Sequence, residues 1–142
     1  IIFVLAGKNV NYQNKNLSDL IKYNKISKNV ILMDELLNVD DYLRYVNLLV
    51  NCSKSSEGFP NIIGEAIMNN CICIASNISD NKYILKNENL IISELNEKSL
   101  ANKVLEIYNL SITERVNIAE NLKKHFKDNY SIKKISEMYK NI

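Results

Sequence analysis

Long hydrophobic runs and cysteine are both scarce in this chain, and each absence excludes a class of protein. No stretch of about 18 uninterrupted apolar residues occurs, which is close to the length that a membrane-spanning helix needs. The N-terminus lacks the basic flank and cleavage site of a secretory signal peptide. The three cysteines are odd in number, which argues against a disulfide framework. We therefore expect a soluble protein of the reducing cytoplasm.

A set of metal ligands is also missing from the sequence. Cys71 and Cys73 lie two residues apart in an apolar run and would share one face of a strand, but no further cysteine pair or nearby histidine joins them. Free cysteine usually packs as a small hydrophobic residue, so both are predicted to lie in the core. The single histidine, His125, lies beside Lys124 and is expected at the surface rather than as a base.

The charge pattern gives little sign of a charged partner. The net charge is only +2, and the lysine-rich stretch from residue 121 to the end has the composition of solvated amphipathic helices. No motif that reads a nucleic-acid groove is present, so we expect no nucleic-acid partner, while peripheral contact with a membrane stays open. With 142 residues, 46% of them hydrophobic, the chain is expected to form one domain.

Apolar runs and helical stripes alternate along the chain, which predicts an α/β fold with a doubly wound parallel sheet of about five strands. The strands are predicted at residues 1–6, 30–33, 45–50, 71–75 and 90–92. Helices are predicted at 17–23, at 39–44 with an acidic first turn, from about 61, at 83–85 and at 97–110. Two more are predicted with Thr113 and Ser131 as their N-caps.

Residues 51–68 join the third strand to its helix and carry the candidate site. Glu57 lies in the loop and Glu65 in the first turn of the helix, while Gly58 and Gly64 allow a ligand or a neighbouring element to approach the backbone closely. Free N–H groups at a helix N-terminus favour a phosphate, and an ionised carboxylate only accepts hydrogen bonds and so suits sugar hydroxyls. The junction therefore predicts a site for a sugar joined to a phosphate.

The run from Glu57 to Ala66 resembles the Glu-x7-Glu signature of the family 4 retaining glycosyltransferases, in the donor-binding domain of the GT-B fold. The resemblance extends over nearly the whole chain. It implies that residues 1–142 are a nucleotide-sugar-binding domain, with Glu57 catalytic, and that the donor is bound by Glu57, Gly58, Phe59, Pro60, Asn61, Ile62 and Glu65. Glu65 would bind the ribose and Glu57 the transferred sugar. Phe59 has an alternative, which is packing of the loop onto the core.

The same resemblance implies a nucleotide-diphosphate sugar as substrate and chemistry that needs no metal, because the Asp-x-Asp motif of the other large glycosyltransferase fold is absent. We expect an N-terminally truncated fragment, since the family's first strand with its basic pair and the acceptor domain are not in the sequence. Such a fragment should not turn over alone. The family context predicts surface polysaccharide or glycolipid synthesis, in the cytoplasm or at the inner face of the membrane.

Some residues depart from the family pattern. Asn70 stands for a helix-ending glycine, Ile72 for a proline and Ser79 for a glycine, and a side chain at Ser79 would crowd a sugar. Asn70 is a mild change because asparagine tolerates the left-handed conformation. Asp34 also replaces a glycine and leaves open an alternative, a non-catalytic nucleotide-binding module or a receiver-like domain that uses Asp34.

The order of the strands follows from the family resemblance and from hydrogen bonding. The family's absent first strand would lie between the strands at residues 1–6 and 45–50. Unpaired buried backbone groups are costly, so we expect these two strands to pair directly. The sheet order would then be 2-1-3-4-5, which is a common doubly wound order.

Overall fold

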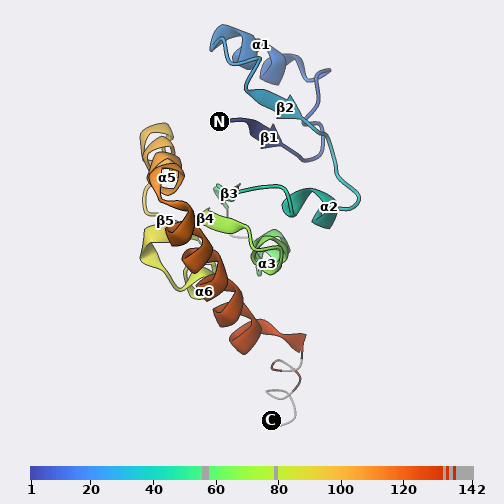
Figure 1. The fold of residues 1–142 in the computed structure, drawn as a ribbon. Helices are drawn as coiled ribbons and strands as arrows, with labels where there is room; N and C mark the ends of the chain where they lie inside the picture. Colours follow the sequence, from blue (N-terminus) through green and yellow to red (C-terminus); the bar gives the residue numbers. More distant parts are fainter. Residues whose placement is uncertain (56–57, 79, 133, 135, 137–142) are drawn as a thin grey trace. The chain divides into compact units, whose positions relative to one another are not determined.

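Short parallel strands alternate with helices along the chain, as predicted for an α/β protein (Figure 1). The computed structural model describes residues 1–55, 58–78, 80–132, 134 and 136. Its contacts divide the chain into two units, Ile1–Val39 and Asp40–Ile142. The predicted site at residues 51–68 belongs entirely to the second unit.

The first unit is a two-stranded parallel sheet with one helix. Strand β1 (Phe3–Leu5) pairs with β2 (Val30–Leu32), and helix α1 (Lys15–Tyr23) connects them. The helix begins after Asn14, whose side chain accepts a hydrogen bond from the N–H of Leu17. Apolar side chains of α1 then pack against the sheet and form a small core with β2, in which the buried residues are Ile21, Val30 and Leu32.

The second unit contains the remaining strands and most of the helices. Its elements are α2 (Asp40–Leu43), β3 (Leu48–Asn51), α3 (Asn61–Met68), β4 (Ile72–Ser76), α4 (Asn81–Leu85), the 3-10 helix η1 (Glu88–Leu90), β5 (Ile91–Ile92), α5 (Glu97–Asn109) and α6 (Ile112–Tyr130). The strands form a parallel sheet in the order β3-β4-β5. All five residues of the central strand β4 are buried, as expected for a parallel sheet with covered faces.

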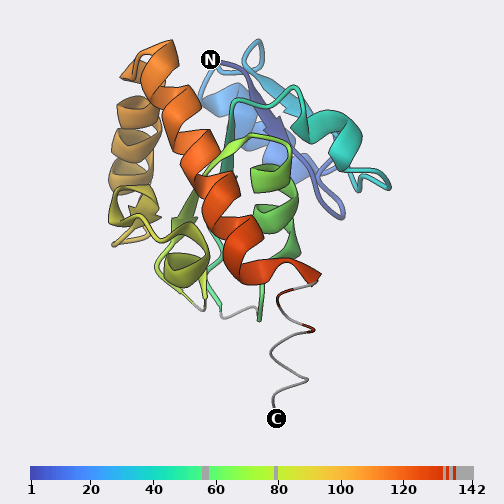
Figure 2. The ribbon, with the colours of Figure 1, turned by 60° about the horizontal axis from the view of Figure 1, so that its bottom comes forward.

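Helix α6 packs against α3, α4 and β4, and Figure 2 shows it running beside α3. Gly64 makes the close approach to α3 feasible, because a Cβ atom at this position would lie only 2.6 Å from Cζ of Phe126. The sequence predicted that Gly58 and Gly64 would let a ligand or a neighbouring element approach the backbone. At Gly64 the neighbouring element is α6. Only a residue without a side chain fits here unless Phe126 moves.

Helix α3 ends in a Schellman motif, which confirms the prediction for Asn70. This residue has φ of 60°, and its N–H donates to the carbonyl of Ile67 at 3.0 Å. The N–H of Cys71 donates to the carbonyl of Ala66 at 2.9 Å. The Asn70 side chain also accepts a hydrogen bond from Lys123 of α6, so asparagine supplies both the backbone conformation and a contact that glycine could not make.

The predicted pairing of the strand at residues 1–6 with the strand at 45–50 would join the two units, and it stays a prediction. Within the first unit β1 pairs with β2, and within the second unit β3 pairs with β4.

The predicted cap of α6 is corrected. Ser111 and not Thr113 is the N-cap: its hydroxyl accepts from the N–H of Glu114, whose carboxylate accepts from the N–H of Ser111. This is a capping box, which satisfies two N–H groups with one pair of residues. Ser131 caps as predicted, since its Oγ accepts from the N–H of Lys134. Most of the helix predicted after it lies outside the described residues.

Candidate functional site

The three strands of the second unit end at one edge, because parallel strands have their carboxyl ends on the same side. They end at Asn51, Ser76 and Ile92. Ligands of open α/β sheets bind at this edge, among the loops that follow the strands. The loop after β3 leads into α3 and contains the predicted site, although Glu57 itself lies outside the described residues, as does Ser79 in the loop after β4.

The N-terminus of α3 has backbone donors that make no hydrogen bond to the described residues. The helix begins at Asn61, as predicted, after Pro60, which provides neither a side-chain cap nor an N–H. The N–H of Ile63 bonds to the carbonyl of Pro60 at 3.0 Å, whereas those of Asn61 and Ile62 have no partner in the described part of the chain. Two unpaired N–H groups with the positive end of the helix dipole can bind an anion.

The two residues before Pro60 differ in their surroundings. A Cβ atom on Gly58 would meet nothing within 4 Å, so space is open beside this backbone. Phe59 packs its ring on α6, with centroid distances of 6.2 Å to Phe126 and 5.4 Å to Tyr130. The alternative of a packing role for Phe59 is therefore supported, although its side chain remains 41% exposed.

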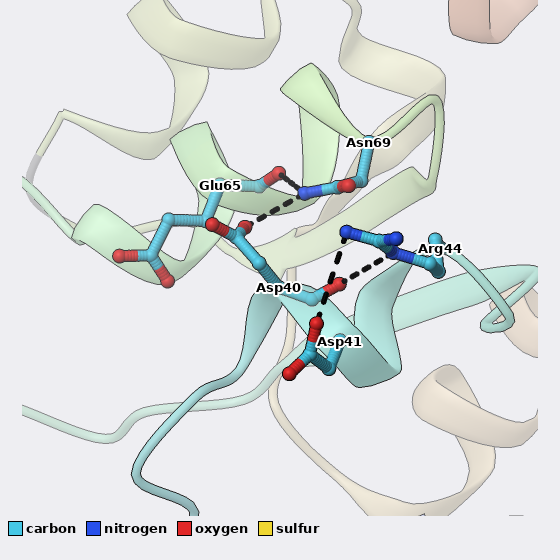
Figure 3. Close-up of polar contacts among 5 residues, drawn as sticks. All are labelled: Asp40, Asp41, Arg44, Glu65 and Asn69. Atoms are coloured by element: carbon cyan, nitrogen blue, oxygen red, sulfur yellow. Dashed lines mark hydrogen bonds and ion pairs between the residues drawn. The ribbon is translucent and has the colours of Figure 1, made fainter.

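Glu65 is exposed on the second turn of α3, not on the first turn as predicted. The Glu65 carboxylate makes no bond within the neighbouring polar cluster (Figure 3). Asn69 Nδ2 donates to the backbone carbonyl of Glu65 at 2.9 Å and to Asp40 Oδ1 at 2.8 Å. Arg44 bonds instead to the carbonyl of Asp40 and to the carboxylate of Asp41.

No hydrogen bond or ion pair of the Glu65 carboxylate occurs in the part of the chain that the structure describes. The helix dipole acts mainly within the first turn, so a purely dipolar role explains Glu65 less well than it would a first-turn residue. An exposed acceptor without a protein partner is available to hydroxyl groups of a ligand.

The C-terminal end of α6 provides aromatic contacts to the residue before Pro60. Phe126 and Tyr130 lie four positions apart, the spacing that puts them on one face of a helix, and their ring centroids are 5.5 Å apart. Burial, with a smaller contribution from Asp80, raises the pKa of Tyr130. These two rings contact Phe59 and thereby position the residue that precedes Pro60 and α3.

His125 links α6 to α4 rather than acting as a free surface residue. Its Nε2 lies 3.1 Å from the backbone carbonyl of Tyr83, and Asn129 Nδ2 lies 3.0 Å from its Nδ1. The Asn129 amide also donates to the His125 carbonyl, which fixes its orientation. Nδ1 therefore accepts, and Nε2 carries the proton and donates to Tyr83.

Asp34 has a structural role in the first unit. It adopts φ of 56°, a conformation for which glycine is the common choice, and this accounts for a glycine in the family pattern. Its carboxylate accepts hydrogen bonds from the N–H of Asn9 at 3.1 Å and from Asn11 Nδ2 at 2.8 Å. Both oxygens are used to hold the turn before α1, so no observation favours the receiver-like alternative.

Two of the cysteines belong to the hydrophobic core. Cys71 and Cys73 are buried core residues, as predicted, and burial raises the pKa of the Cys71 thiol to about 11.

Among the described residues, no three His, Cys, Asp or Glu side chains gather in a way that could hold a metal ion. No described helix has the length and apolar character needed to cross a membrane.

The sequence comparison decides the family. The family model described as "Glycosyl transferases group 1" matches residues 1–109, which is most of the chain. The chain belongs to this family. No curated protein matches the chain in sequence.

Solved glycosyltransferase structures share the fold of this group 1 chain. HepE of Anabaena, in complex with UDP and glucose, superposes with a TM-score of 0.82 at 16% sequence identity over 99% of this chain. A glycosyltransferase from Rickettsia africae gives a TM-score of 0.84 at 18% identity, also over 99% of this chain. The matches cover 41% and 40% of those chains, so this chain spans about two fifths of their length.

Proposed function

We propose that the chain binds the donor of a retaining glycosyltransferase of family 4, a nucleotide-diphosphate sugar, and that the complete protein transfers the sugar to an acceptor. In this proposal Glu65 accepts hydrogen bonds from the ribose hydroxyls, and Glu57 accepts them from the transferred sugar and is the catalytic residue. The backbone from Gly58 to Ile62 surrounds the sugar and the diphosphate. The product would be a surface polysaccharide or glycolipid made on the cytoplasmic side.

The observation that carries the proposal is the arrangement at α3. An exposed carboxylate without a described partner, Glu65, lies one turn beyond a helix N-terminus at which the N–H groups of Asn61 and Ile62 have no partner among the described residues. Open space lies beside Gly58, directly before this helix. A hydroxyl acceptor and an anion site on one helix match the two halves of a nucleotide. The structures of HepE with UDP and with UDP-glucose support a nucleotide-sugar ligand.

The proposed chemistry needs no metal ion, because the site would act by positioning and charge stabilisation. The N–H groups at the start of α3 would stabilise the phosphate that leaves as the sugar is transferred. Binding through Glu57 and Glu65 would hold the anomeric carbon against the acceptor, which converts binding energy into orientation. Charge-assisted hydrogen bonds of this kind contribute about 1.5–3 kcal/mol each.

Titration of the chain with a panel of nucleotide diphosphates, with and without sugars, tests the proposal. For the nucleotide that binds, Glu65→Gln should weaken affinity by about tenfold or more, because one lost charge-assisted bond corresponds to at least that factor. Glu120→Gln is the matched control, since Glu120 is also exposed on a helix but lies on α6. Equal weakening by both substitutions, or no binding of any nucleotide, would refute the proposed role of Glu65.

A further inference from the structure

A cavity of about 200 Å³ opens at the carboxyl edge of the second unit's sheet. Pockets for drug-sized ligands measure about 300–1,000 Å³, so this one is too small for a whole nucleotide sugar and suits a single small group. The loops after all three strands line it, and its polar lining residues are Ser53, Lys54, Ser76, Asn77 and Ser93. None of these is among the residues proposed above to bind the donor.

Buried hydrogen bonds hold the walls of the cavity in place. Ser76 Oγ donates to the carbonyl of Ser53 at 2.8 Å and so ties the loop after β3 to the end of β4. Asn81 Nδ2 donates to the carbonyl of Ser76 at 2.9 Å. Ser76 and Asn81 are each only 2% exposed, so these bonds are shielded from water. The two bonds therefore connect the loop after β3, the end of β4 and the start of α4.

The lining side chains that remain for a ligand are one cationic donor and two groups that can both donate and accept hydrogen bonds. Lys54, Asn77 and Ser93 are exposed, and their side chains make no hydrogen bond within the described ranges of the chain. They offer an ammonium, an amide and a hydroxyl group, and none of the described lining residues carries a carboxylate. A phosphate or carboxylate only accepts hydrogen bonds and prefers cationic donors, so the ammonium of Lys54 favours an anionic group over a neutral one.

We propose that this cavity binds an anionic group, a phosphate or a carboxylate, carried by a substrate of the glycosyltransferase. The assignment of the anionic group to a substrate rests on the proposed function. The loop that contains Ser53 and Lys54 continues along the chain into the proposed donor site. The group would belong either to the transferred sugar or to the acceptor. Lys54 would supply the charge, and Asn77 and Ser93 would orient the oxygens.

The test follows backbone amide signals by NMR while inorganic phosphate is added to the full chain. We expect saturable shifts at Lys54, Asn77 and Ser93, and at least fivefold weaker binding in Lys54→Met, because the charged side chain among the described lining residues is then lost. Lys98→Met is the matched control, since Lys98 is exposed on α5 and outside the cavity. Ser93→Glu, which places a carboxylate at the rim, should also abolish the shifts.

Absence of saturable shifts at these amides, or equal affinity in wild type and Lys54→Met, would overturn the inference. Circular dichroism of both variants establishes that they are folded. Phosphate bound at the N-terminus of α3 would shift Asn61 and Ile62 instead, so the readout separates the two sites.

Two further titrations identify the source of the anion and keep this inference separate from the proposed function. If UDP-glucuronate binds more tightly than UDP-glucose and the preference depends on Lys54, the anionic group belongs to the donor sugar. If glucose 6-phosphate binds in the presence of UDP and its binding depends on Lys54, the anionic group belongs to the acceptor. Lys54→Met should leave affinity for UDP unchanged. Lys54-dependent phosphate binding without any nucleotide binding would reject the proposed function alone, whereas nucleotide binding without phosphate shifts would reject the cavity alone.

Discussion

At the scale of single residues, several polar side chains stabilise backbone conformations for which glycine is the usual choice. Asn70 at the end of α3 and Asp34 after β2 both have positive φ, and both use their side chains to make a further contact. The role of Asn70 was predictable, because asparagine tolerates this conformation and stands where a helix must end. The role of Asp34 was not, since Asn9 and Asn11 lie more than twenty residues away in sequence.

The buried thiol of Cys71 predicts a loss of stability at alkaline pH. Burial raises its pKa from 9.0 to about 11, so above pH 9 the unfolded chain loses a proton that the folded chain keeps. The stabilisation is complete below pH 9 and disappears as the pH approaches 11, a loss of roughly 2–3 kcal/mol at about 1.4 kcal/mol per pKa unit. Urea unfolding across this window measures it.

Cys71→Ala is the control for that measurement, because lysines and tyrosines ionise in the same range in both proteins. The free energy of unfolding of the variant should fall less steeply with pH than that of the wild type. Parallel curves for the two proteins would contradict the assignment to Cys71.

At the scale of helices and strands, hydrophobic periodicity predicted the positions of most elements, and tertiary contacts determined what it could not. The strands and the start of α3 were predicted within a few residues. The N-cap of α6 was misplaced because Ser111 and Thr113 are both good caps, and only the pairing of Ser111 with Glu114 decides between them. The packing of Phe59 on α6 joins residues more than sixty positions apart, so local sequence patterns carry no sign of it.

The packing of α3 on α6 predicts that alanine substitutions at two glycines differ in their effect on the free energy of unfolding. Gly64→Ala places a Cβ atom 2.6 Å from Cζ of Phe126, and overpacking of this kind costs about 1–3 kcal/mol, of which helix propensity returns up to about 1. Gly58→Ala meets open space and should change the free energy of unfolding by less than about 0.5 kcal/mol, while weakening binding of a nucleotide sugar. Urea unfolding compares the two variants.

A smaller ring partner should relieve the clash. Phe126→Leu combined with Gly64→Ala is expected to lose less stability than the sum of the two single substitutions, because the contact is shared. If the losses of stability in the two single variants simply add up in the double variant, contact with Phe126 is not the reason that a side chain at position 64 is destabilising.

At the scale of the whole molecule, an α/β architecture was predictable from the alternation of strands and helices, and a glycosyltransferase domain from ten residues around Glu57 and Glu65. The fold is kept in HepE at only 16% identity, which shows how few residues need to match for this pattern to form. The predicted pairing of β1 with β3 would join the two units, and it stays a prediction. Sequence periodicity predicts strands but not which long-range edges meet.

The most direct test of the account is calorimetric titration of Glu57→Ala and Glu65→Gln with the nucleotide diphosphate and with its sugar form, UDP and UDP-glucose in the first instance. If Glu65 binds the ribose, Glu65→Gln should weaken both ligands by about tenfold or more. If Glu57 binds the sugar, Glu57→Ala should weaken UDP-glucose by a similar factor and leave UDP unchanged. Equal losses of UDP affinity in the two variants would contradict the division of roles between the two carboxylates.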